Sequence, residues 1–233
     1  MNDSRIAGIY EILCDYLSTE RQTLFENVLS KRTRHICAVI EDIYMERNAG
    51  AIMRTCDGVG IQDVHVVESY NLLKVAESIS QGAQKWLSTS YYSESVECAQ
   101  ALKKQGYRIA ATTPHRNGET PDEISLNKPI AVFMGGEKEG LSTALLEEAD
   151  AFITLPNVGF SESYNVSVAA ALVLSRLRER LDAESQFHGL GEIEKARLRI
   201  EWGLKSIREG EKVLARHIGD AQVEELKAFL QAN

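Results

Sequence analysis

Residues 130–177 read IAVFMGGEKEGLSTALLEEADAFITLPNVGFSESYNVSVAAALVLSRL and contain two short apolar runs, each followed by a loop rich in Gly, Ser and Asn. The first run, residues 130–134, stops at a pair of glycines, and the second, residues 151–155, stops at Pro156. Apolar runs of this length, bounded by turn residues, are typical of buried strands. Two strands that each lead into a ligand-facing loop therefore decide the fold of this part of the chain.

Each of these loops leads into a predicted helix, because Ser142 and Asn165 are good N-cap residues. The same alternation runs upstream of residue 130. It predicts strands at residues 35–43, 63–68 and 108–112, and helices at residues 48–59, capped by Asn48 and closed by Gly60, and 94–105. Strands that alternate with helices usually build parallel sheets. We expect one α/β domain over residues 35–184, with a mostly parallel sheet and helices on both faces.

Helical periodicity flanks this domain on both sides. Residues 1–34 form a predicted N-terminal helical extension, and residues 185–233 a C-terminal one, with helices over 192–217 and 223–230. The C-terminal extension either forms a coiled-coil-like arm or packs with the N-terminal helices. Its basic residues offer a possible RNA-facing side, whereas the alternating Glu and Lys favour a solvated helix. These basic residues are Lys195, Arg197, Arg199, Lys205 and Arg208.

Residues 69–92 give a weaker pattern, a polar and weakly helical run followed by SQGAQKW at residues 80–86. Gly82 and its polar neighbours predict an exposed loop that carries Lys85 and Trp86.

The composition is that of an ordinary globular protein, with 44% hydrophobic residues and a net charge of −8 over 233 residues. Proteins that coat nucleic acid by bulk attraction are usually basic, so this charge argues for a local basic patch at most. No apolar run approaches the roughly 20 residues of a membrane span, and the N-terminus lacks the pattern of a signal peptide, so we expect a cytoplasmic location. The four cysteines are scattered without a CxxC pair, which favours reduced, buried thiols.

Candidate functional residues follow four of the predicted strands. Open α/β sheets bind ligands at the carboxyl ends of their strands, so these residues should converge at one edge. They are Arg47, Asn48 and Arg54 after the first strand, Thr113 after the strand at 108–112, Gly135, Gly136 and Glu137, and finally Ser163, Tyr164 and Asn165.

Arg54 has Gly50 and Gly58 one helical turn away on either side, which leaves space around its guanidinium. An arginine in open space can grip a phosphate bidentately, so this position suits an anionic ligand. The alternative is a structural salt bridge, for which the candidate partners are Glu41, Asp42 and Asp57.

Several common sites are absent from the sequence. There is no Walker A loop, GxGxxG, HExxH or GxSxG motif, and the five histidines are dispersed. The sequence therefore does not favour a nucleotide-binding oxidoreductase or a serine triad. It does not favour a metal site either, so we expect no metal.

Three segments in order resemble the three motifs of the SpoU, or TrmH-like, branch of the SPOUT RNA methyltransferases. They are ERNAGAIMRTCDGVGIQDVHVV from residue 46, FMGGEKEGLS from residue 133 and LPNVGFSESYNVSVAAAL from residue 155. The resemblance covers residues 35 to about 181, and the helical flanks resemble those of relatives that methylate the 2′-hydroxyl of a D-loop guanosine in tRNA. It implies a C-terminal trefoil knot, an exception to the rule that chains do not thread loops.

The resemblance also implies S-adenosyl-L-methionine as methyl donor, bound in the knot. The residues that it places around the cofactor, largely through main-chain groups, are Thr113, Met134, Gly135, Gly136, Leu155 and Tyr164. Arg54 takes the family's role of activating the ribose 2′-hydroxyl, by holding a substrate phosphate or stabilising the developing alkoxide. The residues that orient Arg54 and the loops are Asn48, Glu137, Ser163 and Asn165.

A homodimer is implied as well, formed through the motif 3 helix, whose small residues suit close packing. The implied partner is RNA, with tRNA favoured, and the predicted RNA-binding residues are Arg32, Arg34, Arg47, Lys85 and Arg176. One alternative is an rRNA 2′-O-methyltransferase of the same family, because residues 45–47 read MER where tRNA-specific relatives usually carry Lys-Pro-His. Another is a knotted RNA-binding protein without catalytic activity.

Overall fold

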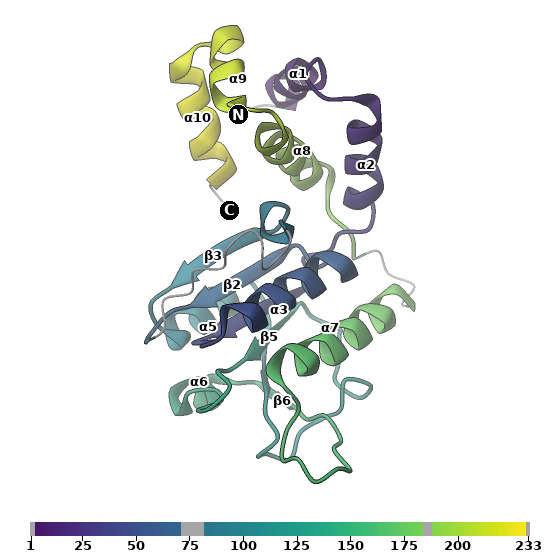
Figure 1. Ribbon diagram of the computed structural model, residues 1–233, viewed down its shortest axis with the longest axis vertical. Coiled ribbons are helices and arrows are strands. Elements are labelled where there is room, and N and C mark those ends of the chain that lie inside the picture. The colour runs from purple at the N-terminus through teal and green to yellow at the C-terminus, as the bar shows by residue number, and fades with distance from the viewer. Residues whose placement is uncertain (1–2, 71–81, 184–187, 232–233) are drawn as a thin grey trace. The chain divides into compact units, whose positions relative to one another are not determined.

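The computed structural model describes residues 3–70, 82–183 and 188–231, and the chain divides into two compact units (Figure 1). The sheet unit is Thr33–His188. The helical unit combines Met1–Arg32 with Gly189–Asn233, so the two ends of the chain share one unit.

Within the described residues, the sheet unit holds six strands in the order β3-β2-β1-β5-β4-β6, and every neighbouring pair is parallel. The strands are β1 Ile36–Glu41, β2 Asp63–Val67, β3 Ser88–Tyr92, β4 Arg108–Thr112, β5 Ile130–Met134 and β6 Ala151–Ile153. The predicted parallel α/β sheet is confirmed.

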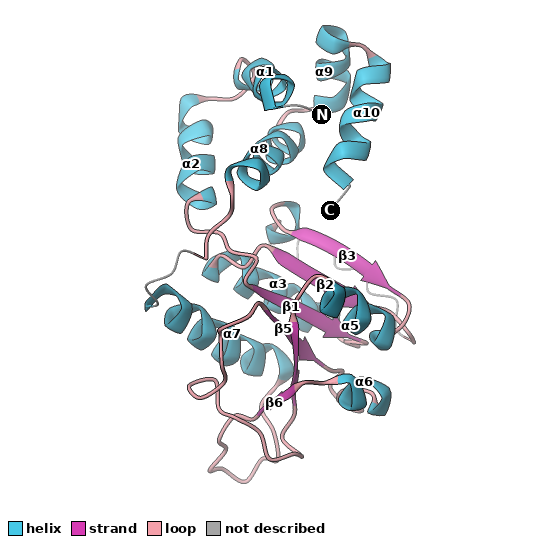
Figure 2. Cartoon of the chain, turned by 180° about the vertical axis from the view of Figure 1, so that it is seen from behind, coloured by secondary structure: helices cyan, strands magenta, loops and turns pink. Residues whose placement is uncertain are grey.

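Helices cover both faces of this sheet (Figures 1 and 2). Helices α3 (Glu46–Val59) and α7 (Val166–Ala183) pack on one face, and α5 (Ser95–Lys104) and α6 (Thr143–Glu148) on the other. Because both faces are covered, every residue of β1, β2 and β5 is buried.

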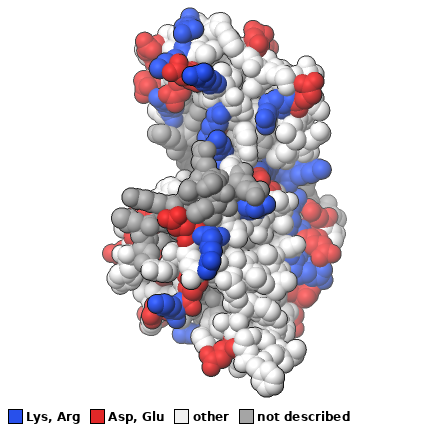
Figure 3. Space-filling model, viewed as in Figure 1, with Lys and Arg blue, Asp and Glu red and all other residues white. Residues whose placement is uncertain are grey.

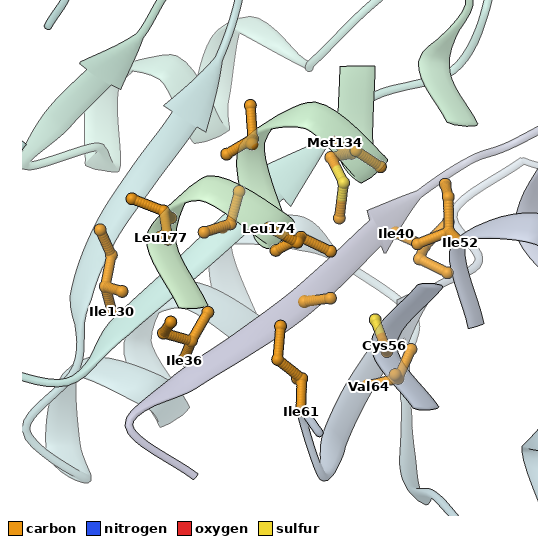
Figure 4. Close-up of a cluster of buried hydrophobic side chains, with 14 of the residues drawn as sticks. Ile36, Ile40, Ile52, Cys56, Ile61, Val64, Ile130, Met134, Leu174 and Leu177 are labelled. Atoms are coloured by element: carbon orange, nitrogen blue, oxygen red, sulfur yellow. The ribbon is translucent and has the colours of Figure 1, made fainter. Parts of the chain in front are cut away.

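The core beneath α3 and α7 joins side chains from distant parts of the sequence. Ile36 and Ile40 of β1 lie in one cluster with Leu174 of α7 and Ile52 of α3 (Figure 4). Each of these side chains is fully buried, which contributes roughly 1.5–3 kcal/mol per residue to the hydrophobic stabilisation of the sheet unit. This core fixes α3 and α7 against each other and against the strands that carry the site.

Helix α3 begins earlier than the sequence predicted. Its N-cap is Met45, whose side chain makes no capping hydrogen bond, and the helix starts at Glu46. Asn48 therefore lies inside the first turn and does not cap the helix, which corrects the predicted boundary. Gly60 ends the helix in the left-handed conformation at φ 79°, as predicted.

The sequence prediction missed strand β3, because residues 69–92 gave only a weak pattern and an expected loop at residues 80–86. Residues 88–92 read STSYY, which lacks the apolar run of the central strands because β3 pairs only with β2 at the edge of the sheet. The predicted exposed loop around Lys85 is in part a short 3₁₀ turn, η1 (Ala83–Lys85), and residues 71–81 lie outside the described residues.

The helical unit consists, in its described part, of α1 (Asp3–Cys14), α2 (Thr19–Leu29), α8 (Glu192–Ser206), α9 (Gly210–Ile218) and α10 (Asp220–Gln231). Its core contains Leu13 of α1, Ile200 of α8 and Leu226 of α10. The C-terminal helices therefore pack with the N-terminal ones, which was one of the two arrangements that the sequence left open.

The helix predicted over residues 192–217 is two helices. Helix α8 ends at Ser206 and α9 begins at Gly210, after Glu209 adopts a left-handed conformation at φ 54°. A Cβ atom on Gly210 would lie 2.4 Å from the carbonyl oxygen of Leu204, so the chain can turn this closely only at a glycine.

Among the described residues, no helix combines the length and the apolar character that a membrane span requires.

Candidate active site at the carboxyl edge of the sheet

A cavity of about 740 Å³ opens at the carboxyl edge of the sheet. Its wall includes Thr113 after β4, Gly135 and Gly136 after β5, and Leu155 after β6. The residues predicted to bind the cofactor thus meet at one place, because parallel strands bring their carboxyl ends to the same edge. Tyr164 also lines the cavity, whereas Met134 is buried at the end of β5 and is not part of the lining.

The loop after β5 is folded tightly on itself. A Cβ atom on Gly135 would lie 2.2 Å from the carbonyl carbon of Gly140, and the Gly140 N–H donates to the Gly136 carbonyl oxygen at 2.9 Å. A Cβ atom on Gly136 would lie 2.7 Å from the carbonyl oxygen of Asp42. Side chains are excluded at both glycines, so the cavity wall here consists of main-chain groups.

Glu137 connects this loop to the start of α3. Its carboxylate accepts hydrogen bonds from the backbone N–H of Tyr44 at 3.0 Å, from that of Met45 at 3.3 Å and from the side-chain amide of Asn48. Burial raises the pKa of Glu137, but these hydrogen bonds lower it by more, so its pKa lies below the ordinary value. The ionised Glu137 carboxylate therefore accepts hydrogen bonds at the N-terminal end of α3. It takes the place of a side-chain cap, because Met45 at the N-cap position has no side-chain oxygen.

Asn165, at the start of α7, is hydrogen-bonded to Asn48 and so to the Glu137 carboxylate. Its side-chain oxygen accepts from the backbone N–H of Ser167 at 2.9 Å and of Val168 at 3.4 Å, which caps α7 as the sequence predicted. Its side-chain amide donates to the side-chain oxygen of Asn48 at 3.4 Å. A chain of hydrogen bonds thus runs from Asn165 through Asn48 to Glu137.

The loop after β6 borders the cavity as well. The Tyr164 hydroxyl donates to the Pro156 carbonyl oxygen at 3.1 Å, and the Asn157 side chain bonds to Gly159 at 2.9 Å and to Ser161 at 2.8 Å. Ser163 lies in this loop, is exposed and lines the cavity. Local hydrogen bonds therefore shape the loop and leave Ser163 facing a potential ligand.

Arg54 lies in the middle of α3 with an exposed side chain, and the cavity lining does not include it. No hydrogen bond or salt bridge involves its guanidinium within residues 3–70, 82–183 and 188–231. The structural salt bridges that the sequence left open do not form: Glu41 accepts from Ser95 and from the Ser142 N–H. The Arg54 charge remains available to a ligand, while Gly58 beside it has open space at its Cα.

The predicted RNA-binding residues are distributed unevenly. Arg32 is only 1% exposed, with its guanidinium 5.6 Å from the centre of the Trp202 ring, so the prediction that it contacts RNA is corrected. Arg34 pairs with Asp63 at the amino edge of the sheet, on the side opposite the cavity. Lys85 is exposed before β3, at that same amino edge.

Arg176 and Arg199 of α8 are engaged within the chain. Arg176 pairs with Asp122 at 2.6 Å and with Glu179 at 2.7 Å, and Arg199 binds Glu26 through two hydrogen bonds of 2.7 Å. Figure 3 shows Lys and Arg interspersed with Asp and Glu on one face of the molecule. This arrangement favours solvated, paired helix faces for these residues. Arg47 is different, because it is exposed beside Asn48 at the carboxyl edge.

Sequence reasoning missed three contributors to the site. The main-chain N–H groups of Tyr44 and Met45 bind Glu137, and the Lys138 side chain lies 5.8 Å from the centre of the Tyr44 ring. Lys138 also lines the cavity. An aromatic residue directly after the predicted strand at residues 35–43 was the available signal.

The sequence profile of the SpoU rRNA Methylase family matches residues 35–175, which is more than half of the chain. The chain belongs to the SpoU rRNA methylase family. The match spans the strands of the sheet unit and all three loops at the cavity, so the expected family is confirmed.

Relatives of this SpoU family chain share most of its length. The tRNA (guanosine(18)-2′-O)-methyltransferase of Borreliella burgdorferi is 34% identical over 191 residues, which cover 82% of this chain and 88% of the relative. The crystal structure of the A. aeolicus TrmH/SpoU tRNA modifying enzyme matches with a TM-score of 0.72 and 29% identity, over 81% of this chain and 98% of that one.

A more distant SpoU structure shares the fold over about two thirds of the chain. The SpoU methyltransferase AviRb from Streptomyces viridochromogenes, in complex with the cofactor AdoMet, has a TM-score of 0.56 and 21% identity, over 66% of this chain and 61% of that one.

Proposed function

We propose that this SpoU family chain transfers a methyl group from S-adenosyl-L-methionine to a ribose 2′-hydroxyl of tRNA in the cytoplasm, with a D-loop guanosine as the target. The observation that carries the proposal is the hydrogen-bonded chain from Asn165 through Asn48 to Glu137, which joins the three family motifs beside one cavity. Relatives that share most of the chain length bear the name of this activity.

The cavity suits a cofactor of this kind. Its volume of about 740 Å³ lies in the usual range for small-molecule sites, roughly 300–1,000 Å³. The glycine loop presents main-chain N–H and C=O groups where side chains are excluded, and such groups recognise adenine edges without charge. We assign cofactor binding to this loop together with Thr113, Leu155 and Tyr164, which form the remaining wall.

When bound, the cofactor supplies an electrophilic methyl group on its sulfonium sulfur, and the ribose 2′-oxygen accepts it. Arginine stays protonated in proteins, so Arg54 does not serve as a literal base. Its exposed guanidinium binds an RNA phosphate and holds the target ribose at the cavity, where a phosphate oxygen can take the hydroxyl proton. Asn48 and Glu137 position α3, and through α3 they position Arg54.

Two further features belong to the proposal. The first is a homodimer through α7, whose exposed face carries Val168 at 47% exposure and Leu172 at 46%. The neighbouring loop adds Val158 and Phe160, both fully exposed, and a surface of this kind typically binds another protein. The second is the trefoil knot of the family, supported by the likeness of the fold to the TrmH/SpoU tRNA modifying enzyme.

The test is transfer of labelled methyl groups to unmodified tRNA and rRNA transcripts, followed by nuclease mapping. We expect label in a 2′-O-methylguanosine of the tRNA D-loop. Arg54→Ala should lower the rate by about 100-fold or more, because a phosphate contact made at the reacting centre is lost, and should leave cofactor affinity within twofold by calorimetry. Arg216→Ala, an exposed arginine of α9, is the matched control and should transfer methyl groups at the normal rate.

The same assay separates the alternatives. Label in rRNA alone would keep the chemistry and change the substrate to rRNA. Absence of label in either RNA, with cofactor binding intact, would refute the proposed reaction and favour an RNA-binding protein without catalytic activity.

A further inference from the structure

Tyr44 is an exposed aromatic side chain with no role in the core. Tyr44 is 68% exposed and lies three positions after Glu41, the buried last residue of β1. Glu137 holds two residues of the segment before α3, and Tyr44 donates its backbone N–H to that carboxylate at 3.0 Å. Tyr44 is therefore anchored through its backbone, while its side chain is exposed.

Charged side chains of both signs lie on this part of the surface, because Glu46 is exposed and the Glu137 carboxylate binds the Tyr44 backbone. Lys138 lies with its Nζ 5.8 Å from the ring centre, and Arg47, three positions further along the chain, is exposed. The Arg47 guanidinium donates to the Met45 sulfur at 3.3 Å, which holds it near the segment that carries Tyr44. An exposed aromatic ring with a cation beside it is a combination that binds single-stranded nucleic acid, because bases stack on the ring while phosphates contact the cation.

Tyr44 and Lys138 lie next to the cavity of the candidate active site. Glu137, which binds the Tyr44 backbone, and Lys138, which contacts the Tyr44 ring, both line the cavity. A ribose whose 2′-hydroxyl reaches into that cavity brings its base to the cavity rim, and an unpaired base there can stack on an exposed aromatic ring.

We propose that Tyr44 is the stacking surface for an unpaired base of the RNA at the methylated nucleotide, with Lys138 as its phosphate-binding neighbour. This inference rests on the proposed function for the presence of RNA at the cavity. It makes Tyr44 a specificity-determining residue that selects unpaired over base-paired target nucleotides.

Binding of unmodified tRNA transcript tests the inference without requiring turnover. Tyr44→Ala should raise the Kd for tRNA by about 5- to 100-fold, the range for loss of one base stack, whereas Tyr44→Phe keeps the ring and should stay within twofold of wild type. Tyr91→Ala is the matched control, because Tyr91 is similarly exposed at 62% but lies on the edge strand β3. Cofactor affinity should be unchanged in all three variants.

Salt dependence distinguishes stacking from charge. Tyr44→Ala should leave the slope of log Kd against log salt concentration unchanged, whereas Lys138→Ala should reduce that slope by roughly 0.7–0.9, the value for one phosphate contact. As a direct readout, 2-aminopurine placed at the methylated position should be quenched when bound by wild type and brighter when bound by Tyr44→Ala.

Several outcomes would overturn the inference. They are a Tyr44→Ala Kd within twofold of wild type, equal weakening by Tyr44→Phe and Tyr44→Ala, or a change of molar mass in Tyr44→Ala that identifies the ring as a contact between two copies of the chain. Wild-type methyl transfer alongside any of these would leave the proposed function standing. Wild-type RNA binding without methyl transfer would refute the proposed function, while the binding series would still decide the role of Tyr44.

Discussion

The side-chain amide of Asn48 donates a hydrogen bond to the carboxylate of Glu137, a residue 89 positions away in the chain. Asn48 is 5% exposed and lies in the first turn of α3, whereas Glu137 belongs to the glycine loop after β5. The same carboxylate accepts the N–H groups of Tyr44 and Met45. One carboxylate therefore holds the start of the helix that carries Arg54 against the loop that borders the cavity.

A double-mutant cycle measures this connection. Asn48→Ala and Glu137→Ala should each destabilise the sheet unit, and the double variant should be less unstable than the sum, with a coupling of about 1 kcal/mol in urea unfolding. Each single variant should also slow methyl transfer, because the helix that positions Arg54 is released. Strict additivity of the two unfolding free energies would show that the bond does not contribute.

Gly136 has no room for a side chain. The carbonyl oxygen of Asp42 would lie 2.7 Å from a Cβ atom there, and Asp42 cannot move easily, since its N–H donates to Val67 at 3.0 Å and its side chain accepts from Tyr70 at 2.8 Å. We expect Gly136→Ala to destabilise the chain by about 1–3 kcal/mol and to weaken cofactor binding at least tenfold.

Gly58→Ala provides the matched comparison for this glycine. Gly58 lies in α3, and a Cβ atom added there would meet nothing within 4 Å, so alanine should stabilise the chain by about 0.5–1 kcal/mol. Thermal and urea unfolding of both variants, with calorimetry for the cofactor, would check the pair. Equal stability of Gly136→Ala and wild type would mean that the loop tolerates the displacement.

His65 in β2 predicts a pH dependence of stability. Burial, together with the positive charge of Arg34, lowers its pKa to about 4, so the native state keeps this imidazole neutral. The unfolded chain binds a proton near the ordinary value of 6.5, and stability therefore falls as the pH drops from about 6.5 towards 4. Above pH 6.5 this contribution is constant.

His65→Phe removes the titrating group and should remove this part of the pH dependence. The difference in unfolding free energy between wild type and variant should change by about 2–3 kcal/mol between pH 7 and pH 4.5, with wild type losing stability on acidification. Urea unfolding at the two pH values measures the change. A difference that is independent of pH would show that the pKa of His65 is the same in the native and unfolded states.

The exposed apolar face of α7 predicts assembly of two chains. Leu172→Asp places a charge on that face and should convert the dimer to a monomer, because burying an unpaired charge is costly. Light scattering measures the change in molar mass. Ile193→Asp, which introduces the same charge at a residue of α8 that is 56% exposed, is the control and should leave the mass unchanged. A monomeric wild type would refute assembly through α7.

Patterns that are local in the sequence predicted much of the fold. The apolar runs of β1 and β5 were recognisable because strands covered on both faces are mostly apolar on both sides. Ser142 and Gly60 marked helix ends through their own side-chain and backbone chemistry. Strand β3 was not predicted, because it is an edge strand of polar and aromatic residues and has no apolar run.

The sequence by itself determined the parallel α/β sheet, the order of the three loops and the family to which they belong, since these depend on residue types that are neighbours in the chain. Only the tertiary structure decided that Glu137 binds Asn48, that Arg32 is buried and that Tyr44 faces solvent beside the cavity. Such contacts join residues far apart in sequence, and the packing of helices on both faces of the sheet brings them together. The periodicity of the sequence does not predict contacts between residues that are far apart in the chain.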